Sequence, residues 1–135
     1  MSGETDLQKL LGSMTPRLQP EVYVFATLPS DAPSPEGLVP VMRFIEHEGT
    51  TLILAESQAK AAGLAGIFRC RMITLDIYSS LEAIGFLAAI TTRLAKAGMG
   101  VNPVSAFYHD HLFVPAERAQ EALAILQKLT AESGG

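Results

Sequence analysis

The triplet His109-Asp110-His111 brings together three consecutive side chains that could do chemistry. On an extended strand, residues two apart project from one face, so both imidazoles would point the same way. A His-x-His pair can bind zinc or another divalent metal, but it needs a third ligand. Residues 46–48, Glu-His-Glu, are suitable in type, and nothing in the sequence brings them close. Hydrogen bonding or ligand contact is therefore favoured over metal binding for His109 and His111.

Asp110 has two interpretations that do not exclude each other. Its carboxylate could form charge-assisted hydrogen bonds with a bound cation. Alternatively, His109 and Asp110 form the tip of a hairpin, because aspartate tolerates turn conformations well. Both hold if the tip faces the other half of the chain.

The segment Ile84-Gly85-Phe86 predicts the start of a helix and a second place for a ligand. The first N–H groups of a helix have no intrahelical partner, and the helix dipole favours an anion there. The carboxylate of an amino acid could lie on these groups, and Gly85 would leave room for it. Alternatively, Gly85 only lets the helix pack on a sheet. Ser79 and Glu82 also fit a capping box, which would start the helix three or four residues earlier.

Asn102 and Ser105 belong to the strand expected beside this helix start. Strand residues alternate between faces, so only one of the two can line a given pocket unless Pro103 introduces a bulge. Asp76 lies in the middle of another strand among apolar neighbours. It is expected to face solvent rather than to be ion-paired.

The first half of the chain is predicted to have few regular elements. Leu7, Leu10, Leu11 and Met14 mark one face of a short helix that Thr5 or Asp6 could cap. Pro16 and Pro20 are expected to interrupt regular structure before a strand at residues 22–26. Residues 29–37 form a proline-rich loop, and 41–47 and 50–54 form a hairpin with Glu48-Gly49 at its bend. A helix over 56–62 ends at Gly63.

The second half shows clearer periodicity. Residues 72–79 alternate as a half-buried strand, and a helix follows whose predicted buried face includes Ile84, Leu87, Ala88, Thr91, Leu94 and Ala95. Gly98 or Gly100 ends that helix. Strands at 101–108, irregular at Pro103 and suited to an edge, and at 111–114 precede a last helix. That helix buries Ala119, Ala122, Leu123, Leu126 and Leu129.

Each half thus follows the split βαββαβ order without its last strand, and the loop replaces the first helix in the first half. The predicted fold is α+β: two ferredoxin-like half-units, 1–68 and 69–135, packed together with a mainly antiparallel sheet and helices on one face.

Composition excludes several classes of function. The 135 residues carry a net charge of −4, without a basic patch for nucleic acid. Apolar residues make up 48% of the chain, yet no run is long enough to span a membrane. Cys70 is the single cysteine and is expected to be a buried apolar residue in a cytoplasmic protein. No nucleophile elbow, P-loop or dinucleotide fingerprint occurs, so no cofactor and no enzyme activity are predicted.

Three stretches resemble ACT-domain proteins. The first comprises residues 79–90 followed by 94–98 and 101–105; the second, Tyr108–Pro115, is similar to small bacterial ACT-like proteins of uncharacterised function, as is Phe44–Leu54. The half-units also resemble those of mammalian cytosolic arginine sensors, where Asp110 matches an aspartate that contacts the ligand's cationic side chain. The loop before Gly85 departs from many ACT loops, because Glu82, Ala83 and Ile84 replace an acidic residue and a proline.

The resemblance implies a regulatory protein that binds a small molecule, with an amino acid as the expected ligand, where ACT half-units meet. The expected ligand-binding residues are Ile84, Gly85, Phe86, Asn102, Ser105, His109 and Asp110. Because ACT units usually pair side by side, a homodimer is one expected assembly. The alternatives are an interaction module without a small ligand and, less favoured, a metal-dependent enzyme that uses His109 and His111.

Overall fold

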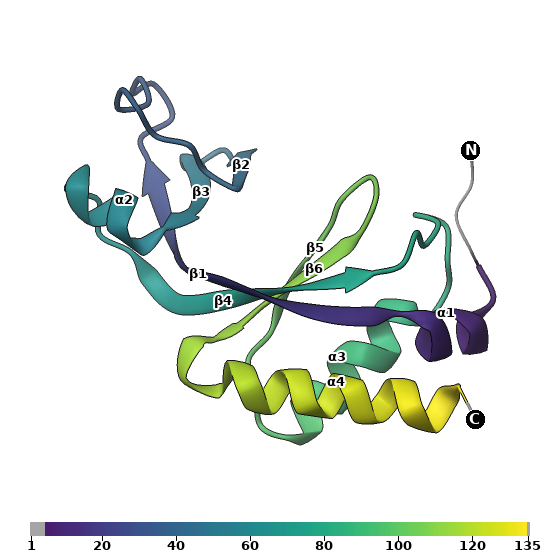
Figure 1. The fold of residues 1–135 in the computed structure, drawn as a ribbon. Helices are drawn as coiled ribbons and strands as arrows, with labels where there is room; N and C mark the ends of the chain where they lie inside the picture. Colours follow the sequence, from purple (N-terminus) through teal and green to yellow (C-terminus); the bar gives the residue numbers. More distant parts are fainter. Residues whose placement is uncertain (1–4, 135) are drawn as a thin grey trace. The chain divides into compact units, whose positions relative to one another are not determined.

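The computed structural model describes residues 5–134 and has the predicted α+β fold (Figure 1). Its six strands form one sheet in the order β2-β3-β1-β4-β6-β5, and the pairings β1–β3, β2–β3 and β5–β6 are antiparallel. The elements are α1 (Leu7–Ser13), β1 (Thr15–Leu28), β2 (Met42–Ile45), β3 (Thr50–Ala55), α2 (Glu56–Ala61), β4 (Ile67–Asp76), α3 (Phe86–Lys96), β5 (Asn102–Ser105), β6 (Asp110–Pro115), a 3₁₀ turn (Ala116–Arg118) and α4 (Ala119–Ser133).

The chain divides into two compact units. Unit 1 holds the chain up to Pro20 together with Arg71 and all that follows, and unit 2 holds Glu21–Cys70. The long strands β1 and β4 each run through both units. Helix α1 therefore belongs to the compact unit of the second half, where it contacts α3 and α4.

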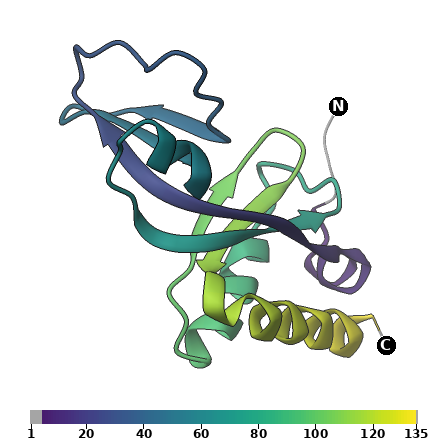
Figure 2. The ribbon, with the colours of Figure 1, turned by 60° about the vertical axis from the view of Figure 1, so that its left-hand side comes forward.

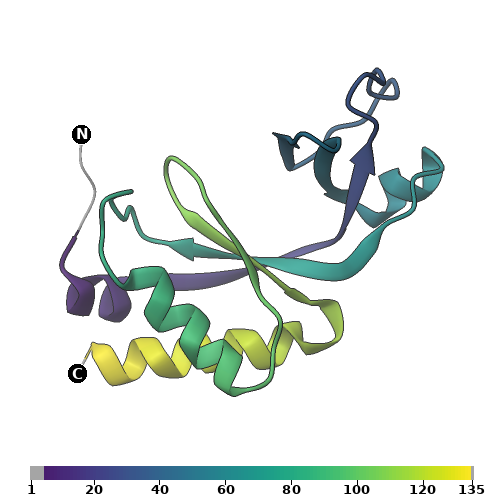
Figure 3. The same cartoon turned by 180° about the vertical axis from the view of Figure 1, so that it is seen from behind.

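Unit 1 places its helices on one face of its strands, as the views from front and back show (Figures 1 and 3). Its core joins inward side chains of β4 and β6 to those of α1, α3 and α4. The fully buried members are Leu10, Ile73, Leu75, Ile90, Leu94, Leu112, Val114, Ala122 and Leu126.

Helix α3 buries a different stripe from the one predicted. Its buried residues are Phe86, Ile90 and Leu94, spaced four apart, whereas Ile84 precedes the helix and is 86% exposed. The prediction failed because it started the periodicity two residues too early, which rotates the apolar stripe around the helix. For α4 the prediction was largely correct, since Ala119, Ala122, Leu126 and Leu129 are buried.

Unit 2 has a smaller core of Val24, Ala26, Leu28, Leu52, Leu54 and Ala59. Helix α2 contacts β3 (Figure 2), and Gly63 follows it with φ +68°, as predicted for a residue just after a helix. The β2–β3 hairpin is also confirmed, but its tip is His47-Glu48, because Glu46 N–H bonds Gly49 O at 2.9 Å. The proline-rich loop has neither helix nor strand.

Pro16 and Pro20 do not end regular structure, contrary to prediction, because both lie within β1. The pairing of β1 with β3 runs only from Tyr23 to Leu28, so both prolines fall outside it. A proline is tolerated where a strand has a neighbour on one side only.

Candidate functional site

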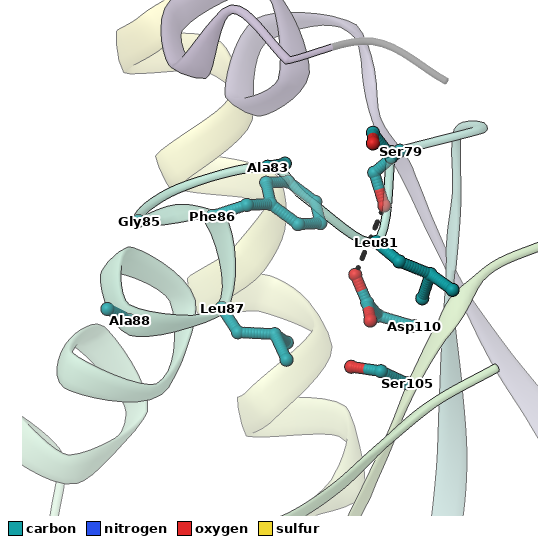
Figure 4. A pocket seen from close by; sticks show the side chains of 10 residues that line it. Ser79, Leu81, Ala83, Gly85, Phe86, Leu87, Ala88, Ser105 and Asp110 are labelled. Atoms are coloured by element: carbon teal, nitrogen blue, oxygen red, sulfur yellow. Dashed lines mark hydrogen bonds between the residues drawn. The ribbon is translucent and has the colours of Figure 1, made fainter. Parts of the chain in front are cut away.

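A pocket of about 160 Å³ lies in unit 1 between the start of α3 and the β5–β6 hairpin (Figure 4). The loop from β4 to α3 closes one side of it. The lining residues are Ser79, Ser80, Leu81, Ala83, Gly85, Phe86, Leu87, Ala88, Ser105 and Asp110. Four of the predicted ligand-binding residues, Gly85, Phe86, Ser105 and Asp110, are thus brought together.

The first turn of α3 forms the positive side of the pocket. Gly85 is the N-cap, and the first helical bond runs from Ala89 N–H to Gly85 O at 2.9 Å. The N–H groups of Phe86, Leu87 and Ala88 precede this bond, and no side chain caps the helix. These three residues all line the pocket, where their amides and the helix dipole favour an anion.

Gly85 is required by its backbone conformation rather than by packing. Its φ is +87°, in the left-handed region that side chains with a Cβ rarely adopt. A Cβ at this position would lie 3.6 Å from Leu7 Cδ2, which is an ordinary contact. Glycine therefore sets the angle at which the loop enters α3, and helix–sheet packing alone would tolerate alanine.

Asp110 forms the negative side. It is only 8% exposed, and Ser79 Oγ donates a hydrogen bond to Asp110 Oδ2 at 3.2 Å. Ser105 pairs directly with Asp110 across the hairpin, so both side chains lie on the same face. Figure 4 shows the carboxylate facing the space in front of Phe86 and Leu87. The pocket therefore combines a buried carboxylate, serine hydroxyls and free amides with apolar walls.

Two local predictions near the pocket were wrong. Ser79 bonds Asp110 instead of capping a helix, and Glu82 N–H bonds Ser80 Oγ, so no capping box forms and α3 begins only at Phe86. Asp110 is the first residue of β6 rather than a turn residue. The hairpin loop covers residues 106–109 and is closed by Ala106 N–H bonding His109 O at 3.0 Å.

Ile84, next to Gly85, does not line the pocket and is 86% exposed, and the sheet separates Asn102, His109 and His111 from the pocket. Leu112 and Val114 of β6 point into the helical core, so His111 projects from the opposite face. His109 reaches that face too: its ring lies 6.4 Å from the His111 ring, and its Nδ1 is 3.2 Å from Ile77 O. Asn102 and Ser105 lie on opposite faces of β5, as predicted. Asn102 shares its face with Val104 and His111, whereas Ser105 shares its face with Pro103.

Polar side chains on that opposite face bond one another. Thr74 Oγ1 lies 3.0 Å from His111 Nδ1 and also accepts from Gln19 Nε2. Asp76 accepts from Arg17 Nε at 2.5 Å, so it is ion-paired and not simply solvent-facing as expected. The hydrogen bond from Arg17 lowers the pKa of Asp76. Burial lowers the pKa of His111, and the neighbouring His109 lowers it further. Among residues 5–134, no group of three or more His, Cys, Asp or Glu side chains could hold a metal.

The sequence missed part of the pocket wall, namely Leu81, Ala83, Leu87 and Ala88, and assigned Ser79 another role. Their positions offered a signal, because all lie between a strand end and the first turn of the following helix. Cys70, in contrast, is fully buried as predicted, and burial raises its pKa to about 12.

The architecture and the pocket define a small α+β protein built from two ferredoxin-like units in tandem. ACT-domain family models match residues 2–71 and 67–128, and the chain therefore belongs to the ACT-domain family. The two matches meet at residues 67–71, whereas the compact units assign α1 to the second half. A boundary at residue 68 stays a prediction.

Several solved structures have the same fold. A Vibrio cholerae protein of unknown function, described as a possible transport protein, is 40% identical over 92% of this chain and 95% of its own, with a TM-score of 0.83. A protein from Agrobacterium tumefaciens is 15% identical over 87% and 89%, with a TM-score of 0.74. The ligand-free regulatory subunit of aspartate kinase from Thermus thermophilus is 14% identical over 87% and 99%, with a TM-score of 0.67.

No curated protein matches the sequence significantly. Within the described part of the chain, no helix has the length and apolar character needed to cross a membrane.

Proposed function

We propose that this chain is a regulatory protein that binds an amino acid in the pocket between α3 and the β5–β6 hairpin. The observation that carries the proposal is the pairing of opposite polarities in one small cavity. The free amides at the start of α3 suit a carboxylate, and the buried Asp110 suits an ammonium group. An α-amino acid carries both groups on the same carbon atom.

The size of the cavity favours a small ligand. An engineered apolar cavity of about 150 Å³ binds benzene, so a cavity of about 160 Å³ suits a ligand of similar size. In this proposal Ser105 contacts the same end of the ligand as Asp110, while Leu87 and Leu81 contact its apolar part. The lining residues all come from unit 1.

Membership of the ACT family supports a regulatory rather than a catalytic role. The fold shared with a regulatory subunit of aspartate kinase is consistent with this role. The similarity to that subunit, at 14% identity, extends to the fold alone.

A thermal-shift screen against the twenty amino acids tests the proposal. A ligand at 100 times its Kd adds about 2.7 kcal/mol to the free energy of unfolding, which raises Tm by several degrees. Asp110→Asn keeps an acceptor for Ser79 but removes the charge, and it is expected to abolish the shift. Asp76→Asn is the matched control, because Asp76 lies on the opposite face; it should keep the shift. If no amino acid at millimolar concentration raises Tm, the proposal fails.

A further inference from the structure

Three consecutive residues at the start of β6 each hold a different residue at the end of β4 or just after it. His109 Nδ1 lies 3.2 Å from Ile77 O, Asp110 Oδ2 accepts from Ser79 Oγ at 3.2 Å, and His111 Nδ1 lies 3.0 Å from Thr74 Oγ1. These three bonds are called here the β6 clasp. Ser79 and Asp110 also line the pocket, so the state of the clasp bears on the shape of the pocket.

The partners of His111 fit its neutral form. Thr74 Oγ1 already accepts a hydrogen bond from Gln19 Nε2 at 3.2 Å, so its own hydrogen is used when it donates to His111 Nδ1. A ring nitrogen that accepts belongs to the neutral imidazole, because both nitrogens of the protonated ring are donors. Protonation of His111 therefore sets a hydrogen on Nδ1 against the hydrogen of Thr74 and breaks this arrangement.

His109 has different partners and keeps them when it is protonated. The carbonyl oxygen of Ile77 can only accept, so His109 Nδ1 carries a hydrogen in either form of the ring. Its Nε2 lies 3.9 Å from Asp76 Oδ1, which pairs with the ring once the ring is charged. Of the two histidines in the clasp, His111 is the one whose bond protonation removes.

The groups around His111 come from all four strands of unit 1. The charged or titratable ones are Arg17 on β1, Asp76 on β4, and His109 and Asp110 beside it on the hairpin. Across the hairpin, the apolar Val104 of β5 pairs with His111. Burial is the largest effect on the pKa of His111 and lowers it; the charge of His109 lowers it further, and that of Asp110 raises it. The folded protein therefore favours the neutral ring, and acid favours a conformation that exposes the ring.

We propose that protonation of His111 opens the β6 clasp and with it the pocket, so that the protein holds its ligand at neutral pH and releases it on acidification. The release step rests on the amino-acid ligand proposed for this pocket, whereas the opening does not. Loss of the Thr74 bond frees the start of β6 from β4 and takes Asp110 away from Ser79. By linkage, a ligand that closes the pocket holds His111 in its neutral form.

Amide hydrogen exchange of the full chain without ligand, measured by NMR from pH 7 to about pH 5.5, tests the opening. Ala106 N–H bonds His109 O, and bonded pairs alternate along the hairpin, so the N–H groups of Asp110 and Leu112 point toward β4. After correction for intrinsic rates, their protection should fall about twofold to tenfold, because uptake of one proton changes an equilibrium at most about tenfold per pH unit. The amide of Leu52 in unit 2 should keep its protection.

Three single variants separate the histidines. His111→Asn keeps an oxygen that accepts from Thr74 but cannot be protonated, so the protection of β6 should no longer depend on pH. His109→Asn keeps a donor for Ile77 O and should leave the pH response in place. His47→Asn is the matched control, because His47 lies in the hairpin of unit 2; it should respond as the native protein does.

A native chain whose β6 amides do not respond to pH overturns the opening. So does an equal loss of protection at Leu52, which would mean that acid acts on the whole fold, or a full response in His111→Asn. Repeating the thermal-shift screen of the twenty amino acids at about pH 5.5 tests the release step. A shift seen at pH 7 should shrink in the native protein and persist in His111→Asn, and a shift equal at both pH values overturns release. No shift at either pH counts against the proposed ligand alone, because the exchange experiment contains no ligand.

Discussion

Asp76 and Asp110 are acidic residues on opposite faces of the sheet in unit 1, and their surroundings differ. Asp76 bonds the Arg17 guanidinium and lies 3.9 Å from His109 Nε2. Asp110 is more deeply buried, and its described hydrogen bond comes from the neutral hydroxyl of Ser79. A buried carboxylate is costly unless its charge is compensated. The comparison teaches that Asp76 has its counter-charge within the fold, whereas the hydrogen bond described for Asp110 comes from a neutral group, which is why we propose Asp110 as the partner of a ligand's ammonium group.

The largest expected effect on the free energy of unfolding comes from the apolar wall of the pocket that Asp110 lines. Phe86 is 3% exposed and joins the pocket wall to the core, so Phe86→Ala should lower the free energy of unfolding by about 3–5 kcal/mol. Tyr108→Ala removes an aromatic ring that is 67% exposed at the hairpin tip, and it should cost under about 1 kcal/mol. Urea titration followed by circular dichroism measures both. Equal losses would mean that the pocket side is no better packed than the hairpin tip.

A smaller effect is expected at the entrance to α3. Gly85→Ala places a Cβ on a backbone with φ +87°, which costs about 1–2 kcal/mol. Gly100→Ala is the matched control, since Gly100 has no positive φ and no atom close to the added Cβ. It should be neutral within about 0.5 kcal/mol. If the two variants unfold at the same urea concentration, the conformation of Gly85 is not what requires glycine there.

The smallest expected effect is a pH dependence of the free energy of unfolding, caused by His111 on the face of the sheet opposite the pocket. The pKa of His111 lies below its ordinary value of 6.5, mainly because the ring is partly buried. At pH values between the folded-state and unfolded-state pKa of His111, the unfolded chain binds more protons than the folded chain. The contribution of His111 to the free energy of unfolding is therefore fully present above about pH 6.5 and is lost as pH falls.

The groups that face His111 include Thr74, which bonds it, and His109 and Asp110, which act on its charge. Replacing His111 with asparagine should therefore flatten the fall in stability from pH 7 to pH 5, measured by urea titration at each pH. An unchanged or steeper slope would contradict the direction of the pKa shift.

Much of the fold followed from local patterns. The cap of α1 by Asp6, which accepts from Lys9 N–H at 3.1 Å, the two hairpins and the glycines after α2 and α3 were predictable, because they depend on residues within a few positions of each other. The strand through Pro16 and Pro20 was not, because it depends on which sides of β1 have a neighbour.

The candidate site shows the same division. The sequence alone determined that a helix would begin beside Gly85 and that two strands would return past it, because backbone preferences and apolar periodicity are local properties. Only the tertiary structure decided that Asp110 begins a strand facing α3 while His109 and His111 lie behind the sheet. The register Ser105–Asp110 sets this, and a shift of one residue would reverse every side chain of the strand. Such a register depends on contacts between distant segments, which no local pattern specifies.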